Sequence, residues 1–251
     1  SCLDADAGYY VDETAQQSQT AAGRGYYVDS TASDSQTECG LGTYQPDTAQ
    51  TSCLDADAGN YVDETAQQYQ TVCPYGRYQP DTAKISCLDA DAGYYVDELE
   101  SSSQTACAAG TFQPDTGQQS CDNAGRGYYV DTTASTSETE CAVGTYQPDY
   151  GQSSCLDADA GYYVDETAQQ SQTACAAGTY QPDTAQTSCD DADAGYYVDS
   201  SAQPSQTACA AGTYQPDTAQ TSCDDADAGY YVGTTAQSSQ TACSAGTYQP
   251  D

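Results

Sequence analysis

A glycine recurs every 17 residues along this chain of 251 residues. An aromatic residue follows two positions after each glycine, and it is Tyr everywhere except at Phe112. The glycines are Gly8, Gly25, Gly42, Gly59, Gly76, Gly93, Gly110, Gly127, Gly144, Gly161, Gly178, Gly195, Gly212, Gly229 and Gly246. A repeat of 17 residues cannot bury a core of its own, so neighbouring repeats must pack together. The period therefore predicts a stacked array instead of one large globular core.

Two kinds of repeat alternate, and together they form a longer period of 34 residues. Counting the glycine as position 1, the GYYV repeat (161–177) has its Cys at position 15, and the GTYQ repeat (178–194) has it at position 12. The alternation slips once, because the repeats at Gly8 and Gly25 are both of the GYYV kind. We expect residues 1–251 to be one continuous array and a segment of a longer chain. Residues 1–24 would form an irregular region with one slipped repeat, and residues 25–251 would alternate regularly.

The composition excludes several classes of protein. Ile, Leu, Val and Phe together number 18, about 7% of the chain, and the formal net charge is −34. These values alone are typical of disordered chains, but 14 Cys and 24 Tyr oppose that interpretation. No run of about 18 apolar residues exists, so the sequence predicts no membrane span. Only four Lys and Arg are present, which argues against binding of nucleic acid.

The cysteines recur at regular spacing and no His accompanies them, which favours disulfides over zinc and an oxidising, extracellular location. From Cys39 onward the spacing alternates between 14 and 20 residues. Pairing across the 20-residue steps would place Cys2 opposite Ala22 and Cys39 opposite Gln19, so both cysteines would lack a partner inside the array. Pairing across the short steps leaves only Cys2 and Cys243, whose partners would lie outside this segment, and is favoured. The short-step pairs are Cys39–Cys53, Cys73–Cys87, Cys107–Cys121, Cys141–Cys155, Cys175–Cys189 and Cys209–Cys223.

Local sequence predicts short strands and turns. Y-Y-V and T-Y-Q are typical of extended pieces, and the P-D-T-A and D-E-T-A segments that follow have turn chemistry. No stretch has an apolar period of 3.6 residues. The predicted fold class is a small disulfide-rich tandem repeat: an elongated rod of 17-residue units with short β-strands, turns and almost no helix. We expect the recurring Tyr to pack between repeats.

Part of the chain resembles a known family. The segment Cys73–Tyr78, C-P-Y-G-R-Y, followed by Cys87, resembles the C-P-x-G-x-Y…C pattern of ephrin-receptor-like cysteine-rich repeats, which belong with TNF-receptor-like modules. The resemblance implies an elongated extracellular array in which the two Cys of one loop bond to each other. Every second repeat departs from the family because it lacks both Cys of such a loop. Long arrays of this kind are similar to giant extracellular filament proteins, including the shafts of flagellar hairs (mastigonemes).

Catalysis is not expected. The chain has no His and only Lys84 as a lysine, and no Cys lies outside the repeat positions. A catalytic carboxylate pair should occur once, whereas here acidic pairs are copied along an array. We therefore predict that the protein is not an enzyme and needs no cofactor.

Pairs of aspartates recur in the frame D-x-D-x-G, which echoes part of a calcium-binding loop. They are Asp4/Asp6, Asp55/Asp57, Asp89/Asp91, Asp157/Asp159, Asp191/Asp193 and Asp225/Asp227. The remaining ligand positions and the closing Glu are missing, and Asn123-Ala124-Gly125 replaces one pair. We therefore expect solvated acidic turns and no metal site, with weak Ca²⁺ binding as the alternative.

Thr stands at position 7 of most repeats and is the candidate for O-glycosylation, since no N-x-S/T sequon exists. The candidates are Thr14, Thr31, Thr48, Thr65, Thr82, Thr116, Thr133, Thr167, Thr184, Thr218 and Thr235. Ser201 takes the same place, while Leu99 and Tyr150 break the pattern. Turn hydrogen bonding by the Thr hydroxyl is the alternative explanation, and the sequence leaves both open.

Together these features predict a structural component of an extracellular filament, cell-surface appendage shaft or stalk, O-glycosylated and assembling with itself or with neighbouring shaft subunits. The alternative is the stalk or ectodomain of a surface adhesin or receptor that binds a protein or glycan partner. A third hypothesis is an acidic surface protein adapted to high salt, although the dense cysteines do not require salt.

Overall fold

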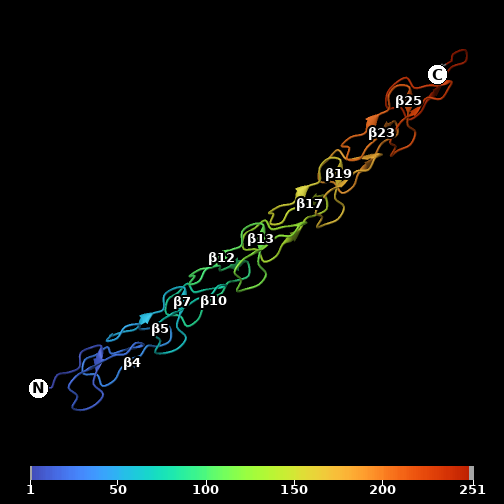
Figure 1. Ribbon diagram of the computed structural model, residues 1–251. Coiled ribbons are helices and arrows are strands. Elements are labelled where there is room, and N and C mark those ends of the chain that lie inside the picture. Colours follow the sequence, from blue (N-terminus) through green and yellow to red (C-terminus); the bar gives the residue numbers. More distant parts are fainter. Residues whose placement is uncertain (1, 249–251) are drawn as a thin grey trace. The chain divides into compact units, whose positions relative to one another are not determined.

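The computed structural model describes residues 2–248, and these residues contain no helix. They form two compact units, each built from a succession of two-stranded hairpins (Figure 1). The first compact unit comprises the residues up to 122 together with 133–137. The second comprises 123–132 and the residues from 138 onward.

Every strand of the first compact unit is two residues long and lies antiparallel to its neighbour in the chain. Its hairpins are β1 (Tyr9–Tyr10) with β2 (Thr20–Ala21), β3 (Tyr26–Tyr27) with β4 (Thr37–Glu38), β5 (Thr43–Tyr44) with β6 (Leu54–Asp55), β7 (Asn60–Tyr61) with β8 (Thr71–Val72), β9 (Arg77–Tyr78) with β10 (Leu88–Asp89) and β11 (Tyr94–Tyr95) with β12 (Thr105–Ala106). Strand β13 (Thr111–Phe112) follows them, and β14 (Asp122–Asn123) lies at the boundary of the two compact units.

The second compact unit repeats the same hairpin. It contains β15 (Tyr128–Tyr129) with β16 (Thr139–Glu140), β17 (Thr145–Tyr146) with β18 (Leu156–Asp157), β19 (Tyr162–Tyr163) with β20 (Thr173–Ala174), β21 (Thr179–Tyr180) with β22 (Asp190–Asp191), β23 (Tyr196–Tyr197) with β24 (Thr207–Ala208), β25 (Thr213–Tyr214) with β26 (Asp224–Asp225) and β27 (Tyr230–Tyr231) with β28 (Thr241–Ala242). In both compact units position 2 pairs with position 14 and position 3 with position 13, so the register follows the sequence period.

The glycine at position 1 is required for two physical reasons, which Gly161 illustrates. The N–H of Tyr162 donates to the carbonyl of Asp159 at 2.9 Å, which makes Gly161 the third residue of a tight turn. Its φ of +85° lies in the left-handed region that this turn position demands. The carbonyl oxygen of Ala202 also lies only 2.4 Å from where a Cβ would stand, so any side chain would collide with backbone.

Position 8 also has an unusual backbone conformation that sequence analysis did not predict. It is mostly Ala, and these residues have φ values near +60°, as at Ala185 and Ala202, both with φ +59°. A non-glycine residue adopts this conformation only when surrounding contacts compensate for its strain.

Small side chains form the core of both compact units. The residue at position 15, Cys or Ala, is fully buried in most repeats, and position 4, Val or Gln, is nearly so. The buried Gln181 has polar partners, because its Nε2 donates to the Ser188 carbonyl at 2.8 Å and its Oε1 accepts from the Asp183 N–H at 3.0 Å. A buried amide with both groups paired avoids the cost of an unsatisfied polar group.

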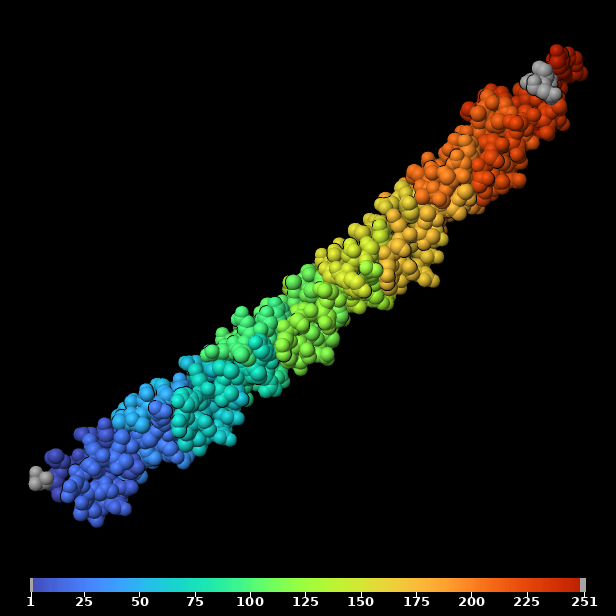
Figure 2. All heavy atoms as spheres, viewed as in Figure 1, coloured from blue at the N-terminus to red at the C-terminus, as the bar shows by residue number. Residues whose placement is uncertain are grey.

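Within each compact unit, backbone hydrogen bonds join a repeat to the next two. The N–H of Gly161 donates to Gln181 in the following repeat at 2.8 Å, and the N–H of Ala202 donates to Cys175, which lies two repeats earlier, also at 2.8 Å. Within each compact unit the colours of Figure 2 therefore succeed one another in chain order. The predicted fold class, a disulfide-rich tandem repeat of short strands and turns, is confirmed for the described residues.

Candidate functional site: the junctions between repeats and the exposed threonines

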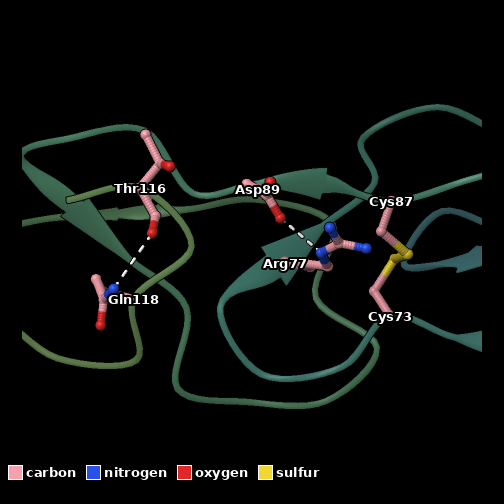
Figure 3. A network of polar contacts seen from close by, with 6 residues as sticks. All are labelled: Cys73, Arg77, Cys87, Asp89, Thr116 and Gln118. Carbon is pink, nitrogen blue, oxygen red and sulfur yellow. Dashed lines mark hydrogen bonds and ion pairs between the residues drawn. A yellow bond between two sulfur atoms is a disulfide. The ribbon is translucent and has the colours of Figure 1, made fainter.

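Disulfides close every second junction between repeats. The structure contains Cys39–Cys53, Cys73–Cys87, Cys107–Cys121, Cys141–Cys155, Cys175–Cys189 and Cys209–Cys223, each spanning 14 residues, the same pairs that the short-step pairing joins. In each pair the Cys at position 15 is fully buried and its partner at position 12 of the next repeat is half-buried. Figure 3 shows the Cys73–Cys87 bond. Among the described residues, Cys2 and Cys243 are unbonded.

A glutamine closes most of the junctions that have no disulfide. At the junction before Cys175, Gln172 occupies position 12, where the GTYQ repeats have Cys. Its Oε1 accepts from the N–H of Asp159 at 2.6 Å, and its Nε2 donates to the carboxylate of Asp159 at 2.7 Å. The same pair of bonds joins Gln19 to Asp6, Gln70 to Asp57, Gln104 to Asp91, Gln206 to Asp193 and Gln240 to Asp227. We call this arrangement the Gln–Asp junction.

Position 16 is Gly at the two remaining junctions. Gly23 replaces the Asp at one of them, and there Gln36 keeps only the bond from the Gly23 N–H, at 2.7 Å. Gly125 replaces the Asp at the other, and there Glu138 accepts the N–H at 2.6 Å. Glu has no amide to donate and would repel an Asp, so it stands where the opposing side chain is absent. That Glu138 lies opposite Gly125 and not opposite an Asp supports a structural role for position 12.

The Gln–Asp junction corrects two expectations. Sequence analysis identified no contact that takes the place of the loop cysteines in every second repeat. The signal was present, because a Gln recurs 13 residues after the second Asp of each pair. In the Gln–Asp junction the second Asp of the pair accepts a hydrogen bond from the Gln amide, whereas sequence analysis expected a free, solvated carboxylate. Within residues 2–248, no group of three or more His, Cys, Asp or Glu is placed to hold a metal ion.

The recurring aromatic residue at position 3 is half-buried in most repeats of both compact units. Four of these phenols have a pKa raised above the ordinary value, mainly because burial disfavours the charged form. The Asp at position 16 of the same repeat raises it further. These residues are Tyr44, Tyr78, Tyr180 and Tyr214, with Asp57, Asp91, Asp193 and Asp227 as the respective carboxylates.

The eleven threonines at position 7 all lie exposed on the loops. Thr167 donates a side-chain hydrogen bond to the Glu140 carboxylate at 3.0 Å. Within the described part of the chain the other ten hydroxyls make no hydrogen bond with protein atoms. Turn hydrogen bonding, the alternative explanation for this ladder, therefore does not account for the recurrence of Thr.

One family model matches part of the chain. Residues 93–141 match the family described as "Tyrosine-protein kinase ephrin type A/B receptor-like". The match begins at a position-1 glycine, Gly93, and ends at a position-15 cysteine, Cys141, so it follows the frame of the 17-residue repeat. No curated protein matches the chain.

The chain is thus an array of cysteine-rich repeats, part of which is similar to the ephrin-receptor-like family. Regular disulfides together with this similarity indicate an extracellular, ectodomain-like module. Among residues 2–248 there is no helix with the length and apolar character needed to cross a bilayer.

Proposed function

We propose that this chain is a non-catalytic structural element of an extracellular filament, appendage shaft or stalk. The observation that carries the proposal is the junction: within residues 2–248 the repeats are closed onto one another in one backbone register, by a disulfide or by a Gln or Glu at position 12. In such an array the number of repeats sets the length, and local cross-links resist proteolysis and extension.

The exposed threonines are proposed to be O-glycosylated. They recur in one loop of each repeat, their side chains are exposed, and ten of the eleven hydroxyls have no protein partner within the described residues. Glycans at these positions would cover the loops and keep the strongly acidic surface hydrated. Assembly with neighbouring subunits belongs to the same proposal.

A second candidate is the stalk or ectodomain of a surface adhesin or receptor. The match of residues 93–141 to an ephrin-receptor-like family favours it. In that case the array would be a spacer, and a domain outside this chain would bind the partner.

Electron microscopy of native material labelled with antibodies against this chain separates the two candidates. A structural shaft predicts label along a continuous filament, whereas a spacer predicts label beside a globular head. Fragmentation mass spectrometry of native peptides tests the glycans. A hexose-containing mass on Thr184 is expected, and unmodified Thr184, Thr218 and Thr235 would contradict the glycan proposal while leaving the structural one intact.

A further inference from the structure

One junction differs from all the others in the side chains around its disulfide. Val72, Tyr75, Ile85 and Leu88 each lie within three residues of Cys73 or Cys87. The disulfide holds the two cysteine Cα atoms 5.7 Å apart, so these four residues share one neighbourhood in the first compact unit. All are 42% to 51% exposed, which is unusual for four large apolar side chains around one point.

No other disulfide junction has large apolar residues at all four corresponding positions. Around Cys175–Cys189 they are Ala174, Ala177, Thr187 and Asp190. The junctions at Cys39–Cys53 and Cys141–Cys155 have two large apolar residues each, and each also has a Glu among the four positions. The repeat fold therefore does not need the apolar set, since other junctions of the same backbone lack it.

Leu99 extends the same surface. The N–H of Glu100 donates to the carbonyl of Cys73 at 3.0 Å, which places Leu99 beside the junction. Leu99 and Val72 occupy the positions that Thr167 and Glu140 have at the Cys141–Cys155 junction. There the two side chains are in contact, because Thr167 donates to Glu140 at 3.0 Å. The threonine ladder is thus interrupted where the exposed apolar residues gather.

A hydrogen bond unique to this place fixes the loop of Leu99. Asn60, where other GYYV repeats have Tyr, is almost fully buried and donates from Nδ2 to the Glu100 carboxylate at 2.8 Å. Glu100, where other repeats have Ala or Gly, has φ +59°. Asn60 also pairs with Val72 across β7 and β8. Asn60 and Glu100, which both depart from the repeat, therefore hold Val72 and Leu99 in place, and these two residues depart from it as well.

The charge of this segment also departs from the rest. Between Glu64 and Asp89 the chain has two cations, Arg77 and Lys84, and one anion, Asp81, whereas the whole chain has a net charge of −34. Arg77 is paired with Asp89 beside the disulfide, as Figure 3 shows, and Lys84 lies 3.3 Å from Asp81. Both cations keep nearly half of their side-chain surface exposed.

We propose that Val72, Tyr75, Ile85, Leu88 and Leu99 form a contact surface, the apolar junction surface, that binds the same surface of a second copy of this chain. Two copies repel along most of their length because both are strongly acidic. Apposing the two surfaces brings together segments that have little net charge, and it removes apolar area from water on both sides. Arg77 and Lys84 of one copy would face Asp81 and Asp89 of the other, as a self-complementary two-fold contact requires. The inference specifies where the assembly put forward under the proposed function would take place, and a receptor stalk could use the same contact.

The test is sedimentation equilibrium of the disulfide-bonded 251-residue chain over a wide concentration range. The apparent mass is expected to rise toward twice the monomer mass, and added salt is expected to strengthen association by screening the acidic repulsion. A variant that copies the Cys175–Cys189 junction should be monomeric and still folded: Val72→Ala, Tyr75→Ala, Ile85→Thr, Leu88→Asp and Leu99→Ser. A second variant without added charge, Tyr75→Ala with Ile85→Thr, should weaken association at least tenfold.

The matched control is Val143→Ala with Leu156→Asp at the Cys141–Cys155 junction, which should leave association unchanged. A chain that stays monomeric at every concentration would overturn the proposal. Equal association of wild type and the five-residue variant would do the same, because the contact would then lie elsewhere.

Discussion

The disulfide junction between Cys175 and Cys189 and the Gln–Asp junction between Asp159 and Gln172 hold the same backbone arrangement by different means. At the first, the N–H of Ala202 donates to Cys175 at 2.8 Å. At the second, the N–H of Ala185 donates to Ala158 at 2.8 Å. One junction is closed by a covalent bond around a buried sulfur, and the other by two hydrogen bonds at a half-buried glutamine.

The comparison separates what sets the register from what stabilises it. The register follows from the glycine turn, the small residue at position 15 and the backbone bonds between repeats, which both junctions share. The group at position 12 only has to hold its loop against the end of the preceding hairpin. A disulfide does so mainly by restricting the unfolded chain, whereas a glutamine acts only in the folded state.

The largest expected effect comes from exchanging one junction type for the other. Replacing Cys175 and Cys189 by Ala should lower the free energy of unfolding by about 3 kcal/mol, the value expected for a loop of this length. A triple variant, Cys175→Ala, Ala176→Asp and Cys189→Gln, copies Ala158, Asp159 and Gln172. It should recover about 1 kcal/mol in urea unfolding experiments, because it restores two hydrogen bonds. If it is no more stable than the double Ala variant, the two junctions are not interchangeable.

Removing the glutamine from one Gln–Asp junction should have a smaller effect. Gln172→Ala leaves the N–H of Asp159 to water and is expected to cost about 1 kcal/mol in urea unfolding. Gln170→Ala, on the exposed face of the same loop, is the control and should change stability by less than about 0.5 kcal/mol. Equal effects of the two substitutions would remove the special role of position 12.

Charge at the junction should make stability depend on pH. Gln172→Glu places a carboxylate against Asp159, and mutual repulsion would raise the folded-state pKa of the pair above its unfolded value. The unfolded chain then binds fewer protons, so stability should fall as the pH rises through the carboxylate range and recover below about pH 4. The double variant Gln172→Glu with Asp159→Gly copies Glu138 and Gly125. Chemical unfolding at several pH values should show that it lacks this dependence, and a dependence that persists would contradict the account.

The smallest effect concerns the tyrosines beside the Gln–Asp junctions. Tyr44, Tyr78, Tyr180 and Tyr214 have a raised pKa, chiefly through burial, so their ring signals in an NMR titration should shift at higher pH than those of an unstructured tyrosine. Their stabilising contribution is present below the ordinary tyrosine pKa of about 10 and is lost as the pH rises through the folded value. Asp193→Asn should lower the pKa of Tyr180 only slightly, because burial is the larger cause; a full return to the ordinary value would assign the shift to Asp193.

Much of the fold was predictable because the period appears in residues with strong local preferences. Gly at position 1 predicts a turn, the aromatic residue at position 3 a short strand, and the slip in alternation favours the short-step disulfides. The left-handed Ala at position 8 was not predictable, since it depends on contacts with repeats that lie 27 and 41 residues away, as for Ala49 with Ala22 and with Gly8.

The candidate site was predictable only in part. Exposed Thr at position 7 follows from its place in a polar turn. The Gln–Asp junction was missed because Gln is common throughout the loops, and only the structure shows which Gln meets an Asp. The apolar junction surface was missed because Val72, Leu88 and Leu99 lie far apart within the repeat pattern and meet only through the disulfide and the backbone bond of Glu100.

Hydrogen exchange at the amides of Ala185 and Ala202 tests the central claim most directly. These two amides lie 17 residues apart and report on a Gln–Asp junction and a disulfide junction of the same geometry. With all disulfides intact, the account predicts strong protection of both, within about tenfold of each other, and protection at Ala185 that is about fivefold lower in the Gln172→Ala variant, as a cost of about 1 kcal/mol implies. Protection of Ala202 together with free exchange at Ala185 in the native chain would contradict it, because only the disulfide junctions would then hold the array together.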